Sequence, residues 1–156
     1  MTTLQEAKDH LLANVEKGTH CPCCERYTKV YRRRLNAAMA RYLILMVKKQ
    51  GDPDGWLHVE TDFRDVSVPS RGDYAKLRYW GLIEARPDAE TGGGRTNGYW
   101  RVTEKGRQFT RGETTVPSYI LLWNNEPVGV SPKEIDIQAA LAGGGFDYAE
   151  LMGEAA

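Results

Sequence analysis

The sequence has no long hydrophobic run. Its longest apolar stretch, Tyr42 to Val47, is far shorter than the roughly 20 residues that a membrane-spanning helix needs. The first 18 residues contain scattered acidic residues and no uninterrupted apolar segment, so they do not match a secretory signal. We therefore expect a soluble, cytoplasmic protein that has no membrane partner.

Cysteine and histidine are both scarce. The chain contains three cysteines, Cys21, Cys23 and Cys24, and three histidines, at positions 10, 20 and 58. An odd number of cysteines within four positions argues against a disulfide framework and fits a reducing compartment. The histidines do not lie near a serine or carboxylate pattern of a known catalytic kind, so we expect a protein that is not an enzyme.

Signals for two ligand classes are also missing. The segment GGGRTNG, residues 92–98, lacks the Gly-Lys-Ser/Thr ending of a phosphate-binding loop, which excludes a nucleotide site of that type. No tryptophan stands among alternating basic residues as a base-stacking platform requires. We interpret the tryptophans as core or interface anchors: Trp56, Trp80, Trp100 and Trp123.

Net charge is zero only as an average over the chain. Residues 1–50 carry ten Lys or Arg and four Asp or Glu, residues 51–112 carry ten of each, and residues 113–156 carry one lysine and seven acids. This asymmetry indicates a polyanionic partner for the basic part. Alternatively, the basic and acidic ends pair with each other, within one chain or between two chains.

Hydrophobic periodicity and capping residues predict an α+β protein. Helices are expected at residues 4–16, 26–49, 61–66, 70–80, 103–111, 131–141 and 146–152. Extended segments are expected at residues 56–59, 82–87 and 99–102, and a β-hairpin at residues 118–131. The composition changes after Gly112, so the expected regions are residues 1–28, 29–112 and 113–156.

One stretch of the sequence resembles a known superfamily. Residues 74–109, YAKLRYWGLIEARPDAETGGGRTNGYWRVTEKGRQF, are similar to the recognition helix, wing and following helix of MarR- and PadR-type regulators. In those regulators Gly-Leu-Ile-Glu leads into the wing and Val-Thr-Glu-Lys-Gly follows it. Local physics agrees, because Gly81 allows a sharp helix end and Thr103 is a good helix cap.

The resemblance implies a winged helix-turn-helix domain over residues 29–112. An N-terminal helix with the cysteine segment precedes this domain, and an acidic β-hairpin with a helix follows it. The resemblance also implies that the helix opened by Ser70 enters the major groove of double-stranded DNA. Counted from about residue 30, where the order of expected elements begins to match, the resemblance extends over about half of the chain, and it includes neither the cysteine segment nor the residues after Gly112.

If this fold is right, the residues on the outer side of the recognition helix and in the wing are the ones expected to bind DNA. Arg71 is the first choice for a base contact, because its planar fork matches guanine acceptors. The expected DNA-binding residues are Ser67, Ser70, Arg71, Lys76 and Arg78 on the helix, and Arg95, Thr96 and Asn97 in the wing. The alternative is that these charged side chains are only solvated, but residues 71–111 hold nine Lys or Arg against five Asp or Glu.

The cysteine segment carries a possible metal site. Cys21 and Cys24 have the Cys-x-x-Cys spacing that places two thiolates on one tetrahedral zinc ion, and the Cys-Pro start resembles a zinc-ribbon knuckle. A second pair of ligands is missing. The remaining ligands are Cys23, His20, His10, His58 or a second subunit. Two readings stay open: one structural zinc, with no other cofactor expected, or a reduced cysteine cluster that joins the first helix to the basic one.

Arg32, Arg33 and Arg34 allow two readings: a secondary nucleic-acid contact, or a surface that binds the acidic C-terminal helix. The function expected from the whole sequence is that of a small DNA-binding protein, a transcriptional regulator or a phage-type accessory factor. It is expected to be a homodimer through residues 4–16 and 118–152. The alternative is a winged-helix module or inhibitor that binds a protein partner through the acidic C-terminal region.

Overall fold

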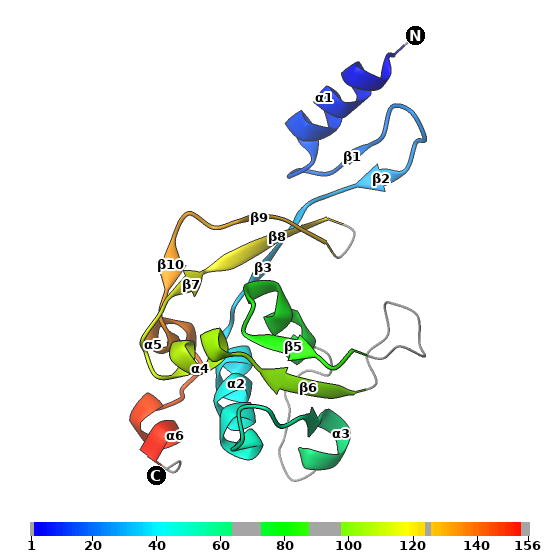
Figure 1. Ribbon diagram of the computed structural model, residues 1–156. Coiled ribbons are helices and arrows are strands. Elements are labelled where there is room, and N and C mark those ends of the chain that lie inside the picture. The colour runs from blue at the N-terminus through cyan, green and yellow to red at the C-terminus, as the bar shows by residue number, and fades with distance from the viewer. Residues whose placement is uncertain (1, 64–72, 88–97, 124–125, 154–156) are drawn as a thin grey trace. The chain divides into compact units, whose positions relative to one another are not determined.

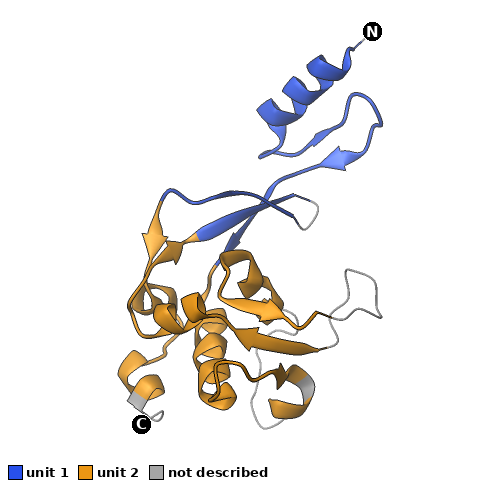
Figure 2. Cartoon of the chain, viewed as in Figure 1, with its two compact units in different colours: residues 1–34, 119–132 blue, residues 35–118, 133–156 orange. Residues whose placement is uncertain are grey.

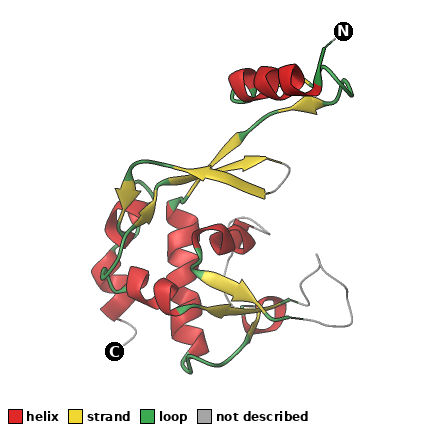
Figure 3. Cartoon of the chain, turned by 45° about the horizontal axis from the view of Figure 1, so that its top comes forward, coloured by secondary structure: helices red, strands yellow, loops and turns green. Residues whose placement is uncertain are grey.

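The computed structural model describes residues 2–63, 73–87, 98–123 and 126–153. It mixes helices with short antiparallel strands, which confirms the α+β class (Figure 3). The chain forms two compact units (Figure 2): unit 1 contains residues 1–34 and 119–132, and unit 2 contains residues 35–118 and 133–156. Both units are discontinuous in sequence, whereas the three regions predicted above are consecutive; those regions stay a prediction.

Unit 1 consists of one helix, one short hairpin and one sheet. The helix is α1, Leu4–Asn14, which the Thr3–Glu6 capping box begins. The hairpin pairs β1, Thr19–His20, with β2, Tyr27–Thr28. The sheet has the order β3-β8-β9, and its strands are β3, Tyr31–Arg34, β8, Tyr119–Trp123, and β9, Glu126–Val130. The β8–β9 pair confirms the predicted C-terminal hairpin.

The helix predicted over residues 26–49 is wrong in nearly its first half, residues 26–36. Residues 27–34 form β2 and β3, and the helix α2, Ala37–Gln50, starts only after Asn36. Asn36 caps α2, because its side-chain oxygen accepts a hydrogen bond from the N–H of Met39 at 2.9 Å. β3 pairs in register with β8, so a partner from the far half of the sequence decides its conformation.

Unit 2 surrounds α2 (Figure 1). Helix α2 contacts a three-stranded sheet of order β4-β6-β5 as well as several short helices. The sheet strands are β4, Leu57–His58, β5, Ile83–Ala85, and β6, Tyr99–Val102. The helices are α3, Val59–Asp62, the 3₁₀ helix η1, Asp73–Trp80, α4, Glu104–Thr110, α5, Ile137–Leu141, and α6, Tyr148–Gly153. A second pair of strands joins β7, Val116–Pro117, to β10, Glu134–Ile135.

An aromatic cluster fills the space beside α2. The ring of Tyr42 stacks on Phe63 with 4.8 Å between centroids, and Tyr74 of η1 lies 5.4 Å from the ring of Tyr42. The Tyr74 ring meets Trp100 of β6 edge to face at 5.9 Å. Burial raises the pKa of Tyr42 far above its usual value. The cluster therefore joins α2, η1 and the sheet through one apolar core.

Other predicted helix starts need correction. The helix predicted from Ser131 begins at Ile137, because Asp136 caps it by accepting from the N–H of Ala139 at 2.8 Å. The N–H of Ser131 instead donates to the carbonyl of Tyr119. Helix α3 begins after His58, not after Thr61, because Nδ1 of His58 accepts from the N–H of Thr61 at 3.3 Å.

The helix predicted over residues 70–80 is a 3₁₀ helix in its described part, Asp73–Trp80, and the proposed cap Ser70 lies outside the described residues. Thr103 caps α4 as predicted. Among the described residues, no helix combines the length and apolar character needed to cross a membrane.

Close contacts join the start of α4 to the end of η1; we call them the turn–helix contact. Gly81 ends η1 with a positive φ of 73°. The hydroxyl of Thr103 donates to the carbonyl of Gly81 at 2.6 Å, and the N–H of Thr103 donates to the carbonyl of Leu82 at 3.0 Å. Gly106 is buried against the same turn, where a Cβ would collide with the carbonyl oxygen of Leu82 and lie 2.6 Å from Cγ1 of Val102. Only glycine fits at position 106.

The substitution Gly106→Ala should therefore destabilise the protein, although alanine is the better helix former. Overpacking of this kind costs about 1–3 kcal/mol, and we expect the midpoint of urea unfolding to fall accordingly. Lys105→Ala, at an exposed position of the same helix, is the control and should change stability by less than about 0.5 kcal/mol. Equal stability of the two variants would contradict the close approach of α4 to Leu82.

Candidate nucleic-acid interface

The predicted DNA-binding residues are only partly described. Lys76 and Arg78 lie on η1. The other six lie outside the described residues: Ser67, Ser70, Arg71, Arg95, Thr96 and Asn97. The described part of the candidate interface therefore consists of η1 and of the strands β5 and β6. These two strands flank, in sequence, the segment that contains Arg95.

The inner side of η1 is fixed in the core. Leu77 is fully buried and Trp80 is 3% exposed. The indole Nε1 of Trp80 donates to the carbonyl of Pro117 at 2.7 Å, which satisfies the polar atom of this buried ring. Because two positions three residues apart face inward, the residues between and beside them face outward.

The outward side of η1 carries two cations. Nζ of Lys76 lies 3.4 Å from the carboxylate of Asp73, so part of its charge is compensated. Arg78 is exposed, and its guanidinium lies 5.1 Å from the ring centroid of Tyr79 while it donates to the Tyr79 hydroxyl at 3.3 Å. Among the described positions of η1, Arg78 is thus the exposed cation, and an aromatic ring orients it.

The strands β5 and β6 also present cations on one face of the sheet. Arg86 directly follows β5, and its guanidinium lies 3.8 Å from the ring centroid of Tyr99. The ring of Tyr99 also contacts His58, whose ring meets it edge to face with 4.8 Å between the centroids. This arrangement holds Arg86 at the base of the predicted wing.

Arg101 of β6 is more strongly compensated than Arg86. Its Nε donates to the carboxylate of Glu84 at 2.7 Å, and its guanidinium lies 4.2 Å from the ring of Trp56. Glu84 and Arg101 are cross-strand partners, which explains the close pairing. Trp56 therefore contacts a basic residue that is distant in the sequence. The sequence alone does not indicate this contact.

Sequence reasoning assigned no role to Arg86 or Arg101. The excess of Lys and Arg over residues 71–111 included both, but it could not separate an exposed cation from a compensated one. The sequence does contain a signal for the Arg86–Tyr99 pair. An arginine lies two residues after Gly-Leu-Ile-Glu, and an aromatic residue starts the returning strand.

The three consecutive arginines lie on β3 in unit 1 and not on a helix. Arg32 stacks over the ring of Tyr119 at 4.8 Å, and Arg33 is half-buried while Arg34 is exposed. Alternation along a strand sends neighbouring side chains to opposite faces. The three guanidiniums therefore do not form one patch.

The three cysteines of the predicted metal site lie on the turn between β1 and β2, and His20 is the last residue of β1. Hydrogen bonds from the N–H groups of Cys24 and Cys23 lower the pKa of the Cys21 thiol below its usual value. Nδ1 of His20 donates to the carbonyl of Glu25 at 3.1 Å. Within the described part of the chain, no three His, Cys, Asp or Glu side chains come together as a metal site.

His10 and His58 do not complete this set. Nε2 of His10 lies 2.9 Å from the hydroxyl of Thr19, and His58 lies in unit 2 beside Tyr99. Comparison with known protein families, curated proteins and solved structures found no match to the chain.

The indole of Trp80 provides a test of how η1 is anchored. Trp80→Phe removes the donor to Pro117, and we expect a loss of about 1–3 kcal/mol in the free energy of unfolding. Trp56→Phe is the matched control, because that ring is only half-buried and should cost less than about 1 kcal/mol. The measurement is urea unfolding followed by far-UV circular dichroism; equal losses would argue against the Trp80 anchor.

Proposed function

We propose that residues 29–112 contain a winged helix-turn-helix domain that binds double-stranded DNA. The observation that carries the proposal is the position of η1, whose inner side is fixed by Leu77 and Trp80 while Arg78 is exposed. Fixed helices with exposed cations suit the reading of a duplex groove.

The order of the elements supports this domain. From α2 the chain runs through β4, α3, η1, β5 and β6, and the sheet order is β4-β6-β5. This is the order helix, strand, helix, helix, strand, strand that the winged-helix reading of the sequence requires. The turn–helix contact also gives a physical reason for the Gly-Leu-Ile-Glu and Val-Thr-Glu-Lys-Gly segments, since Gly81, Thr103 and Gly106 all take part in it.

In this proposal the segment that ends with η1 lies in the major groove. Arg71 reads a base, while Lys76 and Arg78 contact the phosphates beside it. The wing residues Arg95, Thr96 and Asn97 contact the backbone or the minor groove, and Ser67 and Ser70 bind phosphate at the helix start. Arg86 adds a positive charge at the base of the wing.

The biological role that fits such a domain is that of a cytoplasmic transcriptional regulator or a phage-type accessory factor. A single small module binds a half-site weakly, so the proposal includes a homodimer. It includes no catalytic step, because DNA binding of this kind needs only contacts.

A second candidate function is binding of a protein partner. The exposed large hydrophobic side chains favour it: all those found among the described residues lie in unit 1, and three of them, Trp123, Val128 and Val130, lie on the hairpin of the acidic C-terminal region. Exposed apolar surface of this kind marks interaction sites. This function does not exclude DNA binding, because the two would use different units.

Fluorescence anisotropy with mixed-sequence duplex DNA tests the proposal. We expect measurable binding at about 50 mM salt and at least a tenfold loss of affinity at about 200 mM salt, because phosphate contacts release counterions. No binding at the lower salt concentration would contradict the proposal.

A pair of arginine variants locates the binding surface. Arg78→Ala should weaken binding by about 1 kcal/mol, roughly fivefold, and should lower the slope of log affinity against log salt by about 1. Arg26→Ala removes the same charge from an exposed position of unit 1 that lies outside residues 29–112, and it should leave binding nearly unchanged. If both variants lose affinity equally, binding depends on overall charge and not on η1.

A further inference from the structure

The turn between β1 and β2 has a fixed geometry around the cysteines. The N–H of Cys21 donates to the carbonyl of Arg26 at 2.9 Å, and the N–H of Glu25 donates to the carbonyl of Cys21 at 2.9 Å. Glu25 has a positive φ of 63°, which is unusual for a residue other than glycine. These contacts close the chain around Cys21 and Cys24, so the two residues belong to one tight turn.

The sulfur atoms are in a state that suits metal binding. None of the three cysteines forms a disulfide, Cys23 and Cys24 are exposed, and Cys21 is half-buried. The N–H of Cys23 donates to Sγ of Cys21 at 3.4 Å, and such a hydrogen bond stabilises a sulfur that carries negative charge. Cys21 and Cys24 have the spacing of a zinc-binding pair, whereas Cys23 contributes its backbone to the turn.

The described residues of one chain offer only part of a zinc site. Structural zinc ions take four ligands in a tetrahedron. In residues 2–63, which contain all three cysteines and all three histidines, no three such side chains come together with one another or with a carboxylate. His20 donates from Nδ1 to Glu25, and its ring lies edge to face on Tyr27 at 5.3 Å. Within the described residues, the Cys21–Cys24 pair thus accounts for two of the four ligands.

The unit that carries this turn also has the apolar surface that a second chain needs. All large hydrophobic side chains found exposed in the described residues lie in unit 1: Leu4, Leu12, Tyr27, Tyr31, Trp123, Val128 and Val130. Ala7 is the buried residue of α1, so this helix leaves most of its surface uncovered.

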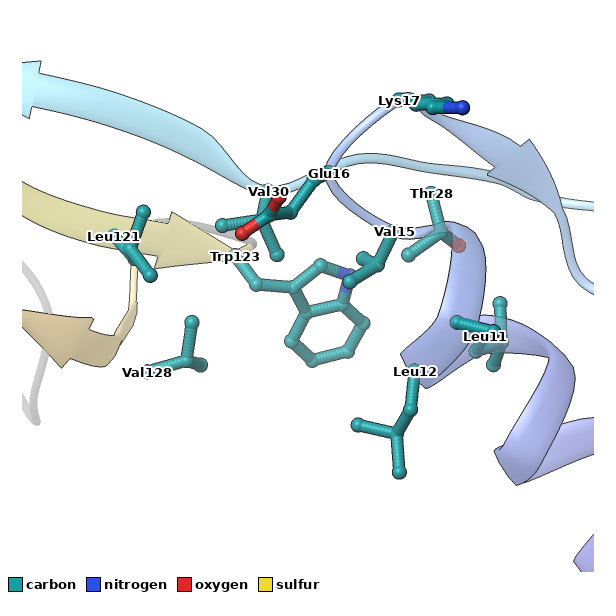
Figure 4. A pocket seen from close by; sticks show the side chains of 11 residues that line it. Leu11, Leu12, Val15, Glu16, Lys17, Thr28, Val30, Leu121, Trp123 and Val128 are labelled. Carbon is teal, nitrogen blue, oxygen red and sulfur yellow. The ribbon is translucent and has the colours of Figure 1, made fainter.

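A pocket of about 500 Å³ lies among these side chains. In Figure 4 the indole of Trp123 extends from β8 toward Leu12 and Val15, with Val128 on the other side. Trp123 is 43% exposed and Leu12 is 78% exposed, which is costly for a free surface. Burial of this surface would add to the stability of a complex.

We propose that two copies of the chain share one zinc ion, which Cys21 and Cys24 of each copy bind as four thiolates. A two-fold symmetric dimer supplies the same residues twice, so a site of two ligands in one chain becomes a site of four in the pair. Each thiol releases its proton as it binds. Unit 1 is then the dimer unit, and this inference does not depend on DNA binding by unit 2.

The first test is metal content together with molecular mass. The full chain is purified under reducing conditions without added metal, and zinc is measured by mass spectrometry while mass is measured by light scattering. We expect a dimer that contains one zinc ion for every two chains. After a chelator removes the zinc, the dissociation constant of the dimer should rise at least tenfold. One zinc per monomer, or no zinc, would overturn the proposal.

Serine variants identify the ligands. Cys21→Ser and Cys24→Ser should each lose the bound zinc and weaken the dimer at least tenfold, whereas Cys23→Ser is the matched control and should keep both. Far-UV circular dichroism checks that each variant is folded. Loss of zinc from Cys23→Ser to the same degree would assign a different ligand set and contradict the shared site.

Cobalt replaces zinc as a probe that reports ligands directly. Titration of the metal-free protein with Co²⁺ should end at one ion per two chains, with the visible absorption of tetrahedral cobalt and the sulfur charge-transfer bands of four thiolates. An end point at one ion per chain would show that a single chain completes its own site. Bands of only two thiolates would show that the second copy contributes other ligands.

Discussion

The architecture of unit 2 depends on the turn–helix contact. Thr103 donates two hydrogen bonds to the turn at Gly81 and Leu82, and Gly106 permits α4 to approach the same carbonyl. These contacts connect the end of η1, the start of β5 and the start of α4 in one place. Because β6 leads directly into α4, they also fix the returning strand of the sheet. The two helices that flank the β5–β6 pair in sequence, η1 and α4, are thereby held together.

The cations of the proposed interface take their positions from this frame. Leu77 and Trp80 fix the inner side of η1, so Arg78 remains outside, and the aromatic ring of Tyr99 holds Arg86 beside the sheet. The carboxylates are placed next to other cations: Asp73 pairs with Lys76 and Glu84 pairs with Arg101. The proposed interface is therefore positively charged at Arg78 and Arg86, although the formal net charge of the whole chain is zero.

Local signals in the sequence predicted the elements that depend on neighbours in the chain. Thr103 as a helix cap, Gly81 as a helix end and the hairpin of β8 and β9 are all confirmed. The strand β3 was missed because its partner β8 is far away in the sequence, and basic residues with apolar ones between them also fit a helix. The Arg101–Trp56 contact was missed for the same reason. The DNA-binding function and all eight of its predicted residues stay predictions from the resemblance, and six of the eight lie outside the described residues.

The most direct measurement of the central claim is a nuclear magnetic resonance titration of the isotope-labelled chain with a short DNA duplex. The account predicts that the amide signals that shift belong to η1, to β5 and β6, and to the segments on either side of them, with unit 1 largely unaffected. Shifts confined to unit 1, or no shifts at low salt, would contradict the account.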